Sequence, residues 1–155
     1  MAGCSDDEIN LEDGDKQVTE EMDKVISDYI IQIYTNNSYS VTDKQIEVHK
    51  VFGTSELDGI ISVYMWSYFN GFNKSTGVET ISGHSLPAVI RLSKNEENYS
   101  VIEYIEPQDG SLYKSSLEKM FPKKYIKNAR QYEGNVQDLQ KEMDKKVRQW
   151  LEEQE

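Results

Sequence analysis

Apolar residues recur with a helical period in the first part of the chain. Between Lys16 and Thr35 they are spaced by three or four positions, which places them on one face of a helix. They are Val18, Met22, Val25, Ile26, Tyr29, Ile30, Ile33 and Tyr34. The pattern predicts an amphipathic helix over residues 16–35 that ends at the polar run Asn36 to Ser38.

The middle of the chain has the pattern of β-strands. Four segments are rich in β-branched and aromatic residues, and polar turn residues separate them in pairs. The predicted strands are 44–52, 59–70, 86–94 and 99–106, with turns at 53–59 and 95–98. We interpret them as two hairpins, with Pro87 favouring an edge position or the entry of its strand.

Helical spacing returns near the C-terminus. Leu112, Leu117, Met120 and Phe121 indicate a short helix that Pro122 interrupts, and a last helix carries Val136, Leu139, Met143, Val147, Trp150 and Leu151. The order of one helix, four grouped strands and further helices predicts an α+β fold with an antiparallel meander. A concave sheet wrapped on a helix, as in cystatin-like or nuclear-transport-factor-like folds, is the expected architecture.

The predicted strand 59–70 is apolar or aromatic on both faces. Because side chains alternate along a strand, Tyr64, Trp66 and Tyr68 share one face. One interpretation is a central strand covered by the first and last helices. The other leaves part of the aromatic face open as a ligand platform beside a long glycine-containing loop, Gly71 to Ser85. In that case Tyr64, Trp66, Tyr68 and His84 are the candidate ligand-binding residues.

The two histidines do not form a recognisable reactive or metal-binding set. Neither His49 nor His84 has another ligand-type residue at a zinc-motif spacing, so no metal site is predicted. Glu56 and Asp58 could be drawn with His49 as a triad, but they lie in a predicted turn where acidic residues are common. We therefore predict no catalytic residue and no cofactor.

Charge restricts the class of partner. The 155 residues carry a formal net charge of -11, which disfavours nucleic acid because Lys and Arg provide affinity for phosphates. Residues 1–15 contain six acidic residues and no basic one. We interpret residues 1–15 as a flexible acidic tether and residues 16–155 as a single domain.

Cys4 is the only cysteine and indicates where the protein acts. It follows Ala2 and Gly3 and precedes a polar stretch, as at the processing site of a bacterial lipoprotein, whose basic and apolar signal would lie upstream. A lipid on Cys4 would attach the domain to the outer face of the membrane after removal of the signal peptide. The alternative is a chance cysteine near a cytoplasmic N-terminus.

Several short segments carry a resemblance to a known group of domains. They are Val51 to Glu56, Gly83 to Val89, Tyr104 to Ser111 and Met120 to Pro122. They resemble uncharacterised small lipoproteins of low-GC Gram-positive bacteria, and the extracytoplasmic tail domain of some β-lactam-sensor-like membrane metallopeptidases. The resemblance covers about residues 44–151 and implies an outward-facing domain with no assigned reaction. The zinc-binding helix of the metallopeptidases has no counterpart in this chain.

The sequence thus predicts a lipid-anchored extracytoplasmic binding or sensing module without catalysis. Its expected partners are the membrane, through the lipid, and a protein or cell-envelope ligand that the sequence does not name. Two alternatives stay open. One is a small enzyme with a site under the 71–85 loop, and the other is a cytoplasmic acidic interaction or immunity protein.

Overall fold

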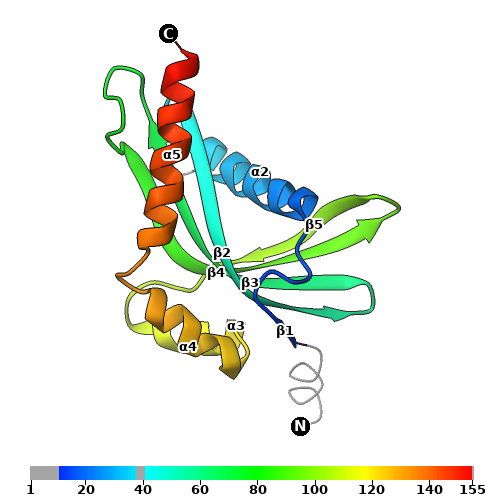
Figure 1. Cartoon of the computed structure of the whole chain (residues 1–155). Helices are drawn as coiled ribbons and strands as arrows, with labels where there is room; N and C mark the ends of the chain where they lie inside the picture. The colour runs from blue at the N-terminus through cyan, green and yellow to red at the C-terminus, as the bar shows by residue number, and fades with distance from the viewer. Residues whose placement is uncertain (1–10, 38–40, 155) are drawn as a thin grey trace.

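The computed structural model describes residues 11–37 and 41–154, and it contains one antiparallel sheet with helices on both faces (Figure 1). The elements in chain order are β1 (Leu11–Asp13), α2 (Glu20–Asn37), β2 (Lys44–Leu57), β3 (Ile60–Phe72), β4 (Ser82–Asn95), β5 (Asn98–Ile105), η1 (Gly110–Leu112), α3 (Tyr113–Met120), α4 (Lys123–Tyr132) and α5 (Gln137–Glu153). The predicted α+β class is confirmed.

The sheet has five strands in the order β1-β2-β3-β4-β5, one more than predicted. The additional strand, β1, pairs Leu11 with Ser55 and Asp13 with Gly53. It lies inside the predicted tether 1–15, so the boundary at residue 15 is wrong and the fold includes residues from Leu11 onward. Residues 1–10 of that tether lie outside the described part of the chain.

The turn predicted at 53–59 is also too long. Strand β2 continues to Leu57, and only Asp58 and Gly59, both with positive φ, form the turn. An Asp-Gly pair suits the tight two-residue hairpin turn. Gly53 is instead needed for packing, because a Cβ at this position would lie 2.1 Å from the hydroxyl oxygen of Tyr125.

Helix α2 packs on one face of the sheet. The Thr19 hydroxyl accepts a hydrogen bond from the Met22 N–H at 3.1 Å, which caps the first turn. The buried stripe of α2 then contacts the central strands β3 and β4, whose apolar side chains on this face are also buried. The members of this layer include Met22, Ile26, Ile30, Val63, Met65, Phe69, Ala88 and Ile90.

Helices α3, α4 and α5 cover the opposite face. The apolar side of α5 lies over β2, and α4 packs against β2 and β3. The buried residues of α5 include Leu139, Met143, Val147 and Trp150. Helices therefore lie on both faces of the sheet, which fits the predicted order of one helix, grouped strands and further helices.

Candidate functional site

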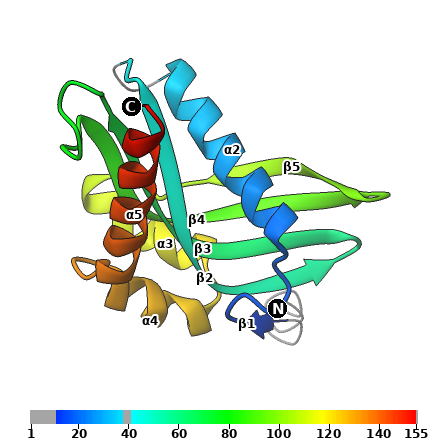
Figure 2. The same ribbon diagram turned by 45° about the horizontal axis from the view of Figure 1, so that its top comes forward.

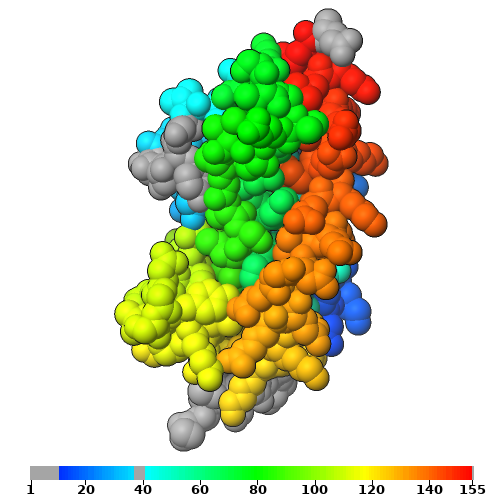
Figure 3. Space-filling view, turned by 90° about the vertical axis from the view of Figure 1, so that its left-hand side faces the viewer, coloured from blue at the N-terminus to red at the C-terminus, as the bar shows by residue number. Residues whose placement is uncertain are grey.

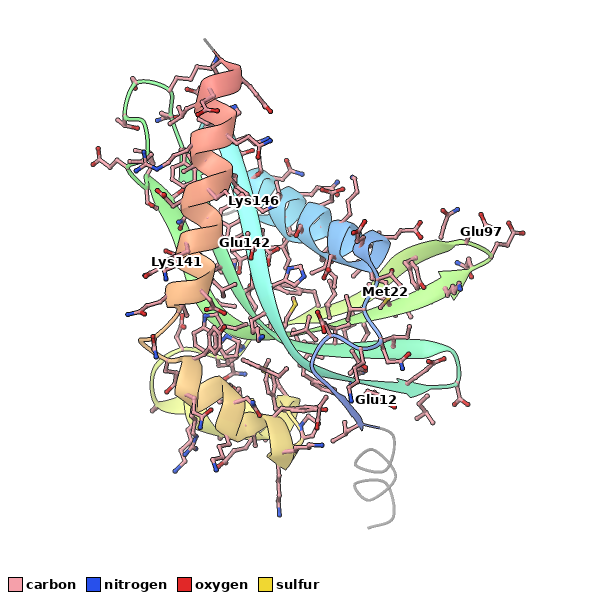
Figure 4. All side chains as sticks on the ribbon, viewed as in Figure 1. Glu12, Met22, Glu97, Lys141, Glu142 and Lys146 are labelled. Atoms are coloured by element: carbon pink, nitrogen blue, oxygen red, sulfur yellow. The ribbon has the colours of Figure 1, made fainter. Side chains whose placement is uncertain are left out.

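Strand β2 lies between α2 and α5 (Figure 2). A groove runs along it, lined by residues of all three elements. It has a volume of 780 Å³, and its floor is the first part of β2, Lys44 to His49. One wall is α2 and the other is α5, whose Glu142 and Lys146 lie on the side of the helix towards β2 (Figure 4). This site could not be predicted from the sequence, because its three sides are far apart in the chain.

The groove exposes an edge of the sheet. Within residues 11–37 and 41–154, the strand beside β2 on this side is β1, which pairs only with Gly53, Thr54 and Ser55. Strand β3 occupies the other side of β2 along its length. The Lys44 to His49 part of β2 therefore has a strand neighbour on one side and the groove on the other.

A buried carboxylate lies beneath the groove. The side chain of Glu47 is fully buried, and three donors satisfy it. Ser27 on α2 and Ser67 on β3 each donate at 2.7 Å, and His49 Nδ1 lies 2.9 Å from Glu47 Oε1. Burial alone would raise the pKa of Glu47, but the His49 charge and these hydrogen bonds outweigh it and hold the pKa below its ordinary value.

His49 is held between two carboxylates. Its Nε2 lies 2.8 Å from Asp23 Oδ1 on α2, while Nδ1 faces Glu47. Burial alone would lower the pKa of His49, but the charge of Glu47 and the contact with Asp23 raise it to about 10. Both ring nitrogens therefore carry protons at neutral pH, and the imidazolium joins α2 to β2.

These pKa shifts predict how stability depends on pH. Glu47 stabilises the fold above its unfolded-state pKa of 4.5, and this stabilisation is lost as the pH falls below that value. His49 stabilises the fold below its unfolded-state pKa of 6.5, and this stabilisation is lost as the pH rises to about 10. We expect the free energy of unfolding, from urea titrations, to be lower at about pH 9.5 than at about pH 5.5. The Glu47→Leu/His49→Leu variant should lose most of this difference; an unchanged difference would contradict the assignment.

Ser67 and His84 are adjacent but do not form a nucleophile and its base. The Ser67 hydroxyl donates to Glu47 at 2.7 Å, so His84 Nε2, 3.0 Å away, must donate to Ser67. His84 Nδ1 is then a buried acceptor that finds no hydrogen-bond partner among the described residues. Burial lowers the pKa of His84, in keeping with a neutral ring. Since Ser67 is fully buried and its proton is directed at Glu47, it is not positioned to attack a substrate.

The proposed aromatic platform is covered. Tyr64 and Trp66 are 6% and 3% exposed, and they contact Phe121 and Tyr132 beneath α3 and α4. Tyr68 is half-buried at the margin of the same cluster. In the space-filling view, α5 and β4 leave only a small part of β3 visible (Figure 3). The interpretation of a covered central strand is therefore the one observed for this face.

His84 does not join these three aromatic residues. It pairs with Phe69 across β3 and β4, so its side chain lies on the α2 face, where its ring stacks on that of Phe69. The predicted loop Gly71 to Ser85 is shortened, because β3 extends to Phe72 and β4 begins at Ser82. The loop is tied to the start of β2, where the Asp43 carboxylate accepts the Lys74 N–H at 2.9 Å.

The remaining sequence predictions concern other parts of the molecule. His49 contacts Asp23 and Glu47 instead of Glu56 and Asp58. Cys4, the predicted lipid attachment site, lies outside the described residues. Among the residues that are described, no three His, Cys, Asp or Glu side chains are grouped to hold a metal ion. No described helix is both long and apolar enough to span a membrane.

Comparison with known proteins adds no relative, since no protein-family model, curated protein or solved structure matches the chain.

Proposed function

We propose that this protein is a non-catalytic binding module, held on the outer face of a bacterial membrane by a lipid on Cys4, and that the groove between α2 and α5 receives its ligand. The observation that carries the binding proposal is the groove itself. Its 780 Å³ volume is within the range of about 300–1,000 Å³ that is typical of ligand sites. The ligand is a protein or another component of the cell envelope.

The position of the groove suits a domain attached through its N-terminal segment. Glu12 lies at one end of the molecule, whereas Lys146 and the C-terminal part of α5 lie towards the other (Figure 4). A lipid upstream of Leu11 would therefore leave the Lys44 end of the groove pointing away from the point of attachment. This arrangement supports the proposal of an outward-facing binding site.

The lipid attachment can be tested on the protein from its native bacterium. We expect mass spectrometry of the membrane fraction to find the mature chain beginning at a lipid-modified Cys4. Treatment of intact cells with a protease should also degrade the protein, because it faces outward. A free Cys4 thiol in a cytosolic protein would contradict the localisation and favour the cytoplasmic interaction protein instead.

The groove can be tested by filling it. Lys146→Trp places a large side chain in the groove, and Lys141→Trp is the matched control because Lys141 points away from β2 (Figure 4). We expect the first variant to lose at least about tenfold in affinity for envelopes of the native bacterium, or about 1.4 kcal/mol. The control should bind like the original protein. Equal binding by both variants would contradict the groove as the ligand site.

A further inference from the structure

We infer that the ligand is an extended polypeptide segment that adds to the sheet as a strand along Lys44 to His49 of β2 and presents basic side chains to the groove. This inference rests on the proposed binding function and names the chemical class of the ligand. Addition of a strand to an exposed sheet edge is an established mode of peptide recognition, in which main-chain hydrogen bonds provide affinity.

The backbone of β2 is oriented for this pairing. Gly71 of β3 pairs with Gln45, but its carbonyl accepts the Ile81 N–H at 2.9 Å on the β4 side, so the backbone groups of Gly71 and Gln45 point away from each other. In an antiparallel ladder the N–H and C=O of one residue point to the same neighbour, and successive residues alternate. Gln45, Glu47 and His49 therefore direct their backbone groups into the groove. This edge can bond a new strand without releasing any bond to β3.

The edge of β2 is recessed, which determines what can reach it. Residues of both α2 and α5 line the groove beside Lys44 to His49, so the two helices flank the strand on either side. A second copy of the chain carries the same two helices beside its own β2 edge, and these would meet the helices of the first copy before the strands could pair. A single extended segment has no flanking helices and can therefore reach the edge. Six paired residues would span roughly 20 Å.

The neighbouring part of the edge already shows such pairing. Strand β1 bonds to β2 at Gly53 to Ser55, and the Gly14 N–H then donates to the Phe52 carbonyl at 2.7 Å. After Gly14 the chain turns away towards α2, which begins at Glu20. The proposed segment would continue the sheet in the row that β1 occupies, immediately beyond the point where β1 ends.

Charge favours a basic ligand. Six carboxylates line the groove against four cationic groups, counting His49 as charged. Asp23, Asp28 and Glu47 share two cations, His49 and Lys24, in ion pairs. Among the described residues Glu20, Glu142 and Glu153 form no ion pair, against two unpaired lysines, Lys44 and Lys146, so both sets leave an excess of one negative charge. The chain as a whole carries -11, which would also attract a cationic segment from a distance. Lysine or arginine side chains on the added strand would meet these free carboxylates.

The inference can be tested with a phage library of random twelve-residue peptides selected on the full chain. We expect enrichment of peptides with net positive charge and β-branched residues. Synthetic versions should slow amide hydrogen exchange at Gln45, Glu47 and His49 at least about tenfold. N-methylation of alternate peptide nitrogens on the pairing side should weaken binding by a similar factor, because it removes main-chain donors.

A matched pair of variants isolates the backbone contribution. Gln45→Pro removes the N–H that points into the groove, whereas Gln45→Ala removes only the side chain. We expect the proline variant to lose at least tenfold in affinity for the selected peptides and the alanine variant to stay within about twofold. Both should retain the circular dichroism of the original protein, since the bonds to β3 are unaffected.

Other outcomes would overturn the inference. The inference would be wrong if the library yielded no peptides that protect the amides of Gln45, Glu47 and His49. It would also be wrong if N-methylated peptides bound equally well, or if acidic peptides were selected. Preferential binding of a synthetic peptide of residues 1–10 would also overturn it, since the occupant would then be the chain's own acidic segment. If Lys146→Trp nevertheless abolishes envelope binding, the groove remains the ligand site and only the peptide class is wrong.

Discussion

Replacing Glu47 by alanine is expected to lower the free energy of unfolding by about 3–5 kcal/mol, because it leaves His49 as a buried charge without its fully buried partner. Ser27 and Ser67 would lose their acceptor in the same step. For a chain of this size the change corresponds to a fall in Tm of roughly 10 °C. Urea and thermal unfolding, followed by circular dichroism, measure both quantities.

Glu103→Ala is the matched control for this variant. Glu103 also pairs with a cation, Arg91, at 2.9 Å, but both side chains are nearly half exposed, and such pairs contribute about 0–1 kcal/mol. The double variant Glu47→Leu/His49→Leu should be more stable than Glu47→Ala, because it removes the charge together with its partner. Similar losses for Glu47→Ala and Glu103→Ala would contradict the role assigned to the buried network.

Replacing Trp66 by alanine is expected to cost about 3–5 kcal/mol of stability through the cavity it leaves. The indole is buried against Tyr132, and its Nε1–H donates to the Ser85 hydroxyl at 2.8 Å. Ile102→Ala is the control, since Ile102 is 52% exposed and its truncation should be nearly neutral. Urea unfolding at constant pH compares the two.

The same variant separates a packing role from a ligand-binding role. If Trp66 only packs, the folded fraction of Trp66→Ala should bind envelopes of the native bacterium with unchanged affinity. Nearly unchanged stability combined with loss of binding would instead favour the aromatic platform predicted from sequence.

Periodicity was sufficient to predict the layers of this fold. The stripe from Val18 to Tyr34 predicts α2, and the two apolar faces of β3 predict a central strand with cover on both sides. Strand β1 could not be found this way, since three residues, Leu-Glu-Asp, carry no recognisable alternation. Its existence depends on pairing with β2 and on the hydroxyl of Tyr125, which donates to the Glu12 carbonyl at 3.0 Å.

The groove and the polar network beneath it also could not be predicted from the sequence. Glu47 and His49 alternate with Ile46 and Val48, which is the ordinary pattern of a half-exposed strand. Nothing local indicates that this polar face is buried, because Asp23 and Ser67, which contact it, are 26 and 20 positions away. The alternation did contain one usable signal: a Glu and a His at i and i+2 share a face and can pair.

The same polar network links stability to the proposed site. Asp23, Ser27, Glu47 and His49 all line the groove, and their hydrogen bonds join α2 to the floor that β2 provides. Loss of the His49 charge at high pH is expected to loosen one wall of the groove as well as to destabilise the fold. Binding affinity for the selected peptides should therefore fall together with the free energy of unfolding above about pH 9.

The central claim is that the groove between α2 and α5 holds the ligand on the cell surface, and site-specific photo-crosslinking in intact cells tests it most directly. A photoreactive residue at Gln149, which lines the groove, is expected to give one discrete adduct on irradiation. Lys146→Trp in the same chain should abolish the adduct, and the photoreactive residue placed at Lys141 should give none. Equal adducts from positions 149 and 141, or an adduct that persists with Lys146→Trp, would contradict the claim.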